Sequence, residues 1–319
     1  MCQEGILLFE IFGAKVYAYG AALSLSVLLA VCLMHFCCFP RAYASCGSRP
    51  CAVMLTLCVL PFALIGARLV YCLTRLNGVM SDLGPAFIPK LWFGGYSIVG
   101  AMLGGTLGAW LYARGKKLNF ARLLDAAVPA MLLVIAIARG AEAFTSQGLG
   151  DILDSEALCF FPFGVGDEWG DFYIPVFFWE ALAALCILVY TLLRQKKGQL
   201  DGTALTALLF LCASQVFLES LREDDSIRFG FVRFNQLVSV AGLLGILLLW
   251  AHQKKAPRPV LTKRLIVFFV LVVLMIGIEF ALDKTMLNHV SLYAVMIASL
   301  SVCCWMAVTL PGARQTAEA

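Results

Sequence analysis

The sequence predicts an all-α polytopic membrane protein, and three properties of the whole chain support this fold class. Of its 319 residues, 61% are hydrophobic, only 14% are charged, and the mean hydropathy is +0.89. A soluble domain is typically about half apolar and about a quarter charged. At about 20 residues per spanning helix, the apolar content suffices for roughly eight or nine spans. The same composition excludes a disordered chain and a domain that binds nucleic acid.

Nine apolar segments follow one another along the chain and predict nine spans. They cover residues 16–39, 51–73, 91–113, 123–138, 174–193, 203–221, 234–251, 265–282 and 290–310. The fourth segment is short and contains Pro129, which predicts a kinked or partly shielded helix. Most of the thirteen cysteines lie inside these segments without CxxC spacing. We therefore interpret them as apolar side chains, and we expect no metal site and no cofactor.

The loops between the segments differ sharply in positive charge. Fifteen Lys and Arg residues lie in one set of alternate loops, and seven lie in the other set. Cytoplasmic loops carry the excess of positive charge. This predicts an N-terminus outside the membrane and a cytoplasmic C-terminus, which an odd number of spans also requires.

The loops and a change in composition divide the chain into three parts. Residues 1–252 form a predicted core of seven spans, in which the outer loop 141–173 contains acidic residues and no Lys or Arg. A loop of this length is too long for a simple connection, so we expect a small folded cap there. Residues 253–263 form a basic linker that contains proline. Residues 264–319 form a C-terminal membrane appendage of two helices.

Several charged residues lie at membrane depth, where each costs about 2.5–3.5 kcal/mol on insertion scales. Three of them, Arg139, Glu180 and Glu219, fall in the predicted outer half of the membrane or at its outer surface, together with Glu142 and Arg222. The two arginines can bind a phosphate through their planar forks, while the glutamates hold those forks in place. A buried ion-pair network that only joins helices remains the alternative.

Two other membrane carboxylates have simpler interpretations. Asp125 begins the fourth segment, where a helix N-terminus would stabilise it. Glu279 lies near the end of the eighth segment, where it would reach the interface or pair within the C-terminal hairpin.

A glycine-rich stretch opens the third span. Gly100, Gly104 and Gly108 recur every four residues and predict a smooth stripe for close helix packing. Gly94 and Gly95 lie at the outer edge of the membrane, where a turn would let backbone amides face a lipid headgroup.

An ordered set of short motifs resembles the bacterial prolipoprotein diacylglyceryl transferase family. The set extends from about Tyr19 to Trp250. It comprises Tyr19-Gly20, Gly66-Ala67-Arg68-Leu69-Val70-Tyr71, Gly94-Gly95-x-Ser97, Asp125-x-x-x-Pro129, Arg139, Pro175, Trp179-Glu180, Glu219-x-x-Arg222-x-x-Asp225 and Gln236.

The resemblance implies a multi-pass transferase of the bacterial cytoplasmic membrane that acts at the outer face. The family moves the diacylglyceryl group of phosphatidylglycerol to the lipobox cysteine of a prolipoprotein, so its partners are that lipid and a prolipoprotein signal peptide. Arg139 and Arg222 would bind the phosphate, with Tyr19, Gly94 and Gly95 at the headgroup. Glu180 and Glu219 would orient the arginines, and Glu142 is a candidate base.

The chain also departs from the family pattern at groups associated with catalysis. The family has a histidine where this chain has Val99, and an arginine where it has Gln215. Of the family motif Gly-Arg-x-Gly-Asn-Phe-x-Asn-Gly-Glu, only Arg139 remains in residues 138–147. The alternative function is therefore a catalytically degenerate membrane protein that binds a lipid or a partner on the same scaffold.

Overall fold

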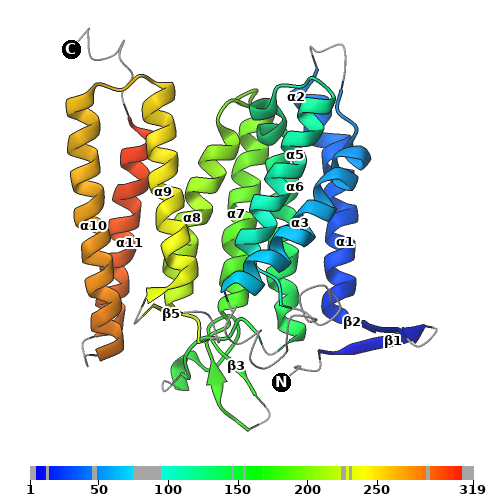
Figure 1. Cartoon of the computed structure of the whole chain (residues 1–319). Helices are drawn as coiled ribbons and strands as arrows, with labels where there is room; N and C mark the ends of the chain where they lie inside the picture. The colour runs from blue at the N-terminus through cyan, green and yellow to red at the C-terminus, as the bar shows by residue number, and fades with distance from the viewer. Residues whose placement is uncertain are drawn as a thin grey trace. The chain divides into compact units, whose positions relative to one another are not determined.

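The computed structural model describes residues 5–11, 14–44, 49–74, 95–145, 147–153, 156–167, 169–223, 228–229, 232–284 and 288–310. The chain is an all-α polytopic membrane protein (Figure 1). Within the described residues, eight helical segments are long and apolar enough to span a membrane. They are Ala18–Ala42, Ala52–Thr74, Phe120–Phe144, Val176–Lys196, Thr203–Ser220, Phe234–Gln253, Arg258–Lys284 and His289–Val308.

These segments correspond to eight of the nine predicted spans. The first contains α1 (Ala18–Leu33), a π-helical stretch (Met34–Cys38) and α2 (Phe39–Ala42). The others are α3 (Ala52–Thr74), α6 (Phe120–Gly140) with the 3₁₀ helix η5 (Ala141–Phe144), α7 (Val176–Lys196), α8 (Thr203–Ser220), α9 (Phe234–Gln253), α10 (Arg258–Lys284) and α11 (His289–Val308).

The predicted third span is the helix α5 (Ile98–Gly115), which is not among the eight. Its 18 residues are as many as α8 has. Its hydropathy is lower because glycines, Tyr112 and Arg114 replace larger aliphatic side chains. Residues 75–94, which include the predicted start of this span, lie outside the described part.

The helices divide into two compact units. The first unit contains Met1–Ala22, Ala136–Ile187 and Leu205–Ala319, and the second contains Leu23–Ile135 and Leu188–Ala204. The unit boundaries therefore fall within α1, α6, α7 and α8.

In the second unit, α3 and α5 pack at unusually close range. A Cβ atom added at Gly100 or Gly104 would collide with the carbonyl oxygens of Gly66 or Phe62 on α3. The predicted glycine stripe is thus a helix-packing surface. Asp125 is stabilised by a helix N-terminus as expected, but by that of α8 and not that of its own helix. Its carboxylate accepts hydrogen bonds from the Gly202 amide at 3.0 Å and the Ala204 amide at 2.7 Å, at the start of α8.

In the first unit, α10 and α11 pack beside α8 and α9. Their shared core contains Leu243, Ile246, Met275, Met296 and Leu300. At one end of this bundle, Lys254 Nζ donates to the carbonyls of Val308 and Leu310, and the Arg264 guanidinium donates to those of Met306 and Thr309. These cations therefore satisfy carbonyls at the C-terminus of α11 that the helix itself leaves unpaired.

The structure corrects two predicted boundaries. The fourth span is not short, since the helical segment Phe120–Phe144 has 25 residues and passes through Pro129. Its polar ends are helical although they lower the local hydropathy. Helix α10 begins at Arg258, inside the stretch expected to be a linker.

Among the described residues, the first unit contains three short antiparallel hairpins that the sequence did not predict. They pair β1 (Leu7–Ile11) with β2 (Ala14–Tyr17), β3 (Val165–Gly166) with β4 (Phe172–Tyr173), and β5 (Arg228–Phe229) with β6 (Val232–Arg233). The 3₁₀ helix η6 (Glu156–Leu158) precedes β3.

Candidate functional site

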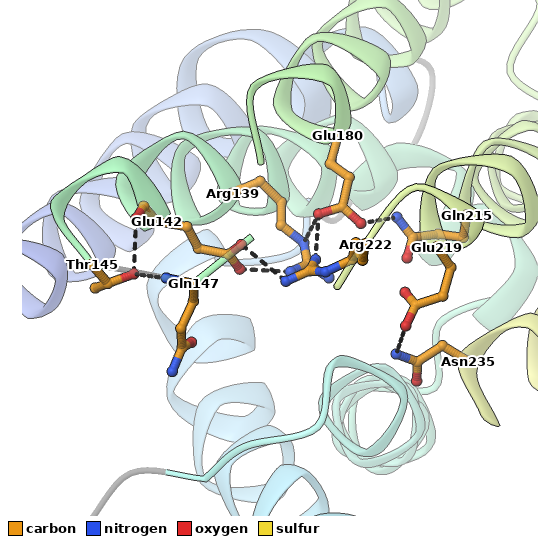
Figure 2. Close-up of polar contacts among 9 residues, drawn as sticks. All are labelled: Arg139, Glu142, Thr145, Gln147, Glu180, Gln215, Glu219, Arg222 and Asn235. Atoms are coloured by element: carbon orange, nitrogen blue, oxygen red, sulfur yellow. Dashed lines mark hydrogen bonds and ion pairs between the residues drawn. The ribbon is translucent and has the colours of Figure 1, made fainter. Parts of the chain in front are cut away.

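Four charged side chains of the first unit form a closed ring of ion pairs (Figure 2). Arg139 Nη1 lies 2.6 Å from Glu142 Oε1, and Arg139 Nε lies 3.2 Å from Glu180 Oε2. Arg222 Nη1 lies 2.7 Å from Glu180 Oε2, and Arg222 Nη2 lies 3.4 Å from Glu142 Oε2. Each arginine therefore contacts both carboxylates, and each carboxylate contacts both arginines.

The ring is largely shielded from solvent. The exposed fractions of the side chains are 12% for Arg139, 9% for Glu142, 8% for Arg222 and 1% for Glu180. Isolated charges in such surroundings are strongly destabilising, and removing one member of a buried pair is costly. Alternation of two positive and two negative groups makes the ring neutral and allows it to be buried.

One hydrogen-bond donor of the ring, Nη2 of Arg139, is not bound by the other ring residues. The Nε and Nη1 atoms of Arg139 are used by Glu180 and Glu142, whereas its Nη2 forms no hydrogen bond or ion pair with any residue that the structure describes. Arg139 is also the most exposed member of the ring. A guanidinium presents its donors in a planar fork that suits phosphate oxygens.

The backbone after α6 places Arg139 and Glu142 together. Arg139 lies in the last turn of α6, and the 3₁₀ turn of η5 returns the Glu142 side chain three residues later. Gly148 then approaches this carboxylate closely, because a Cβ atom there would lie 2.5 Å from Glu142 Oε2 and 2.8 Å from the Phe177 Cβ. Its φ of +76° also favours glycine.

A short backbone ladder holds the fourth member, Arg222, which follows α8. Gly150 and Arg222 form an antiparallel β-bridge, and the Glu223 amide donates to the Leu149 carbonyl at 3.1 Å. The segment after Gly148 thus connects the α6 side of the ring to the α8 side.

Glu219 and Gln215 lie beside the ring on α8. Gln215 Nε2 donates to Glu180 Oε1 at 3.0 Å, so this amide occupies the position next to Glu180 where the family resemblance led us to expect an arginine. Asn235 Nδ2 donates to Glu219 Oε1 at 3.0 Å. The other oxygen of Glu219, Oε2, is buried without a hydrogen-bond partner, and Glu219 forms no ion pair with a described residue.

The remaining predicted site residues lie in different places. Tyr19, in the first turn of α1, belongs to the first unit and interacts electrostatically with Glu142 and Arg139. Gly95 belongs to the second unit, where its carbonyl accepts a hydrogen bond from Arg68 Nη1 at 3.2 Å. Gly94 lies outside the described residues.

Sequence reasoning missed Asn235 and Gly148 as contributors to this site. Asn235 directly precedes Gln236, which the motif pattern does contain, so its position in the first turn of α9 was the available signal. For Gly148, nothing in the sequence indicated the contact with Glu142. Among the described residues, no group of three or more His, Cys, Asp or Glu side chains could hold a metal ion.

Comparison with known proteins connects this geometry to a family. A family model described as prolipoprotein diacylglyceryl transferase matches residues 6–252. That range includes the whole ring and ends before α10, so the C-terminal hairpin of α10 and α11 lies beyond it.

Individual relatives match over the same part of the chain. A protein of Clostridium kluyveri named phosphatidylglycerol–prolipoprotein diacylglyceryl transferase is 31% identical over 242 residues, which is 74% of this chain and 91% of the relative. Proteins of the same name from Clostridium novyi and Clostridium botulinum are 30% and 28% identical. They cover 76% and 78% of this chain, and 93% and 98% of their own lengths.

Proposed function

This chain belongs to the prolipoprotein diacylglyceryl transferase family, and from that premise we propose that it transfers the diacylglyceryl group of phosphatidylglycerol to the lipobox cysteine of prolipoproteins. The acceptor enters as a thiolate, which is the reactive form of cysteine. Its sulfur attacks the glycerol carbon that carries the phosphate. A thioether C–S bond forms, the C–O bond breaks with its electron pair on the phosphate oxygen, and glycerol phosphate leaves.

The observation that carries the proposal is the Nη2 donor of Arg139, which no described residue binds, on a neutral, buried ring. Arg139 binds the lipid phosphate through this donor and stabilises the charge that develops on the leaving group. Arg222 contacts the same two carboxylates and assists Arg139 in binding the phosphate. Glu142 and Glu180 fix both guanidinium groups, so little reorganisation is needed when the lipid binds.

The other assignments follow from the family resemblance and stay predictions. Tyr19, Gly94 and Gly95 contact the headgroup, and Glu219 supports the arginines. The reaction takes place at the outer face of the bacterial cytoplasmic membrane, with the N-terminus outside. The loop 141–173 then faces the compartment in which the prolipoprotein cysteine is presented.

The test combines complementation with an arginine series. We expect the full chain to rescue a strain depleted of its own transferase, with the diacylglyceryl mass added to its lipoproteins. Arg139→Ala should lower turnover of phosphatidylglycerol with a lipobox peptide by about 100-fold or more. Arg139→Lys should recover part of it, because an ammonium group supplies the positive charge but cannot contact both carboxylates and the phosphate as the guanidinium does. The control is Lys116→Ala, an exposed cation in the turn after α5. Unchanged turnover in Arg139→Ala would remove the proposed phosphate site.

The non-catalytic alternative is favoured by one observation, the Gln215 amide that bonds Glu180 where the family has an arginine. A chain that binds phosphatidylglycerol vesicles but neither rescues the strain nor turns over the peptide would support it. The variant Val99→His with Gln215→Arg restores both family residues. Positioned acid–base groups typically contribute about 10²–10⁴-fold. If the natural chain turns over the peptide slowly, the double variant should therefore turn it over at least about tenfold faster.

A further inference from the structure

Helix α10 carries one carboxylate that contacts the core of the first unit. Glu279 Oε1 accepts a hydrogen bond from Gln236 Nε2 at 2.6 Å, a short distance typical of a charge-assisted bond. A carboxylate within a spanning helix is costly without a partner. Glu279 therefore has a partner outside the hairpin. It contacts α9, inside the family-matched region, from a helix that lies outside it.

The Gln236 side chain joins three helices. Its Oε1 accepts the Arg233 amide at 2.9 Å and caps the start of α9, while its Nε2 also donates to the Val216 carbonyl of α8 at 3.3 Å. Gln236 is only 3% exposed. One amide group thus fixes the first turn of α9 between α8 and α10.

The neighbouring residue of that turn faces the ring. Asn235 Nδ2 holds Glu219 Oε1 at 3.0 Å, and Figure 2 shows this pair beside Arg222. Glu219 interacts electrostatically with Arg222, Glu180 and Arg139. Because residues 235 and 236 are adjacent in one helical turn, a shift of Gln236 also shifts the group that holds Glu219.

Apolar packing supports the same contact. Met275 and Ile278, just before Glu279, are buried in one core with Val216. The rings of Phe217 and Tyr293 meet edge to face with 5.8 Å between their centroids. The hairpin is therefore fixed to α8 at the level of the Gln236 amide.

We propose that Glu279 is a positioning residue for the transfer reaction, which it supports through Gln236 and Asn235 by fixing the Glu219 carboxylate. This inference rests on the proposed function. It makes the C-terminal hairpin part of the catalytic apparatus of this chain. Because the proposed route from Glu279 to the site runs through Gln236, Asn235 and Glu219, its loss lowers kcat and leaves the apparent affinity for the lipid nearly unchanged.

The first test compares Glu279→Leu, Glu279→Gln and the control Asp283→Leu in the full chain, reconstituted with phosphatidylglycerol and a lipobox peptide. Asp283 lies one turn later on α10, and its ion pair with Lys284 is exposed. We expect Glu279→Leu to lower kcat about tenfold with KM for the lipid within about twofold, since small displacements of catalytic groups are costly. Glu279→Gln, which keeps an acceptor oxygen, should retain most of the activity, and Asp283→Leu all of it.

The second test exchanges the hydrogen-bond donor and acceptor of the Gln236–Glu279 pair. It does not depend on how well Glu279→Leu folds. Gln236→Glu places two carboxylates against each other and should lower kcat strongly. Adding Glu279→Gln restores one donor and one acceptor. This double variant should have a kcat at least about fivefold above that of Gln236→Glu, since the effects of substitutions at two contacting residues are not additive. A double variant as slow as Gln236→Glu, or an unchanged kcat in folded Glu279→Leu, would overturn the inference. An inactive natural chain would instead refute the proposed function, and this inference with it.

Discussion

The three carboxylates of the site differ in how many of their oxygens are already used. Glu142 gives one oxygen to each arginine, and Glu180 gives one oxygen to both arginines and the other to Gln215. Both groups are therefore occupied in holding the ring. Of the three, only Glu219 retains a buried oxygen that no described residue contacts by a hydrogen bond. The role of Glu142 as candidate base, which the family resemblance implied, stays a prediction.

The ring residues could be predicted from the sequence because charges are conspicuous in apolar segments. Their cost in a membrane singles out Arg139 and Glu180 without any structural knowledge. The pairing could not be predicted, because it depends on the 3₁₀ turn after α6 and on the Gly150–Arg222 bridge. Asn235 and Gly148 carry no unusual charge or spacing, so only the fold reveals their contacts.

Asp151 and Glu223 are two neighbouring carboxyl groups that lie outside the membrane-spanning helices. Partial desolvation raises the pKa of Asp151, and the nearby Glu223 raises it further, while His289 and Arg233 oppose this shift. A carboxyl whose folded pKa exceeds its unfolded value binds more protons in the folded state. Its unfavourable effect is therefore absent at low pH and develops as the pH rises from the ordinary carboxyl range through the raised pKa.

The variant Asp151→Asn should remove this effect. The amide can donate to Glu223 without a titrating proton, so thermal stability should increase slightly at pH 7 to 8 and change little near pH 4. Unfolding of the purified chain in detergent, measured across this pH range, tests the difference. Glu10→Gln, an exposed carboxylate on β1, is the control. A variant less stable than the natural chain at pH 8 would contradict the assigned sign.

At the scale of elements, helix positions were predictable and the connections between them were not. Apolar runs of about 20 residues located every long helix, because each must cover the thickness of a bilayer. The short hairpins were missed because strands of two to five residues leave almost no pattern. The polar ends of α6 were missed because hydropathy falls there while helix propensity does not.

The contact between α3 and α5 depends on individual glycines, and this gives a paired prediction. A Cβ atom at Gly104 would collide with the Phe62 backbone, whereas one at Gly105 would make ordinary contacts of 3.5 Å with Val59 and 3.7 Å with Ala63. We expect Gly104→Ala to destabilise the chain by about 1–3 kcal/mol through overpacking. Gly105→Ala should be neutral or slightly stabilising, because alanine favours helix over glycine. Thermal unfolding in one detergent measures both, and equal effects would contradict the packing assigned to α5.

At the scale of the whole molecule, the predicted orientation in the membrane rests on the distribution of positive charge between the loops. The fifteen basic residues of one loop set include the basic stretch after α9, where Lys254 and Arg264 also stabilise the end of α11. These two residues therefore contribute both to local helix stability and to the positive-inside signal. Loop 141–173, which is acidic and has no Lys or Arg, belongs to the opposite set.

The orientation is tested by two cysteines from opposite loop sets. Cys159 lies in the loop between α6 and α7 and is partly exposed, whereas Cys46 is outside the described residues and precedes the predicted second span in the sequence. In variants that retain only one of them, a membrane-impermeant maleimide added to intact cells should modify Cys159 and not Cys46. After the cells are opened, Cys46 should react as well, which excludes a buried thiol as the reason for its protection. Modification of Cys46 in intact cells would reverse the orientation and place the loop 141–173 in the cytoplasm. The transfer reaction at the outer face would then lose its physical basis, because the prolipoprotein cysteine and the loop beside the ring would lie on opposite sides of the membrane.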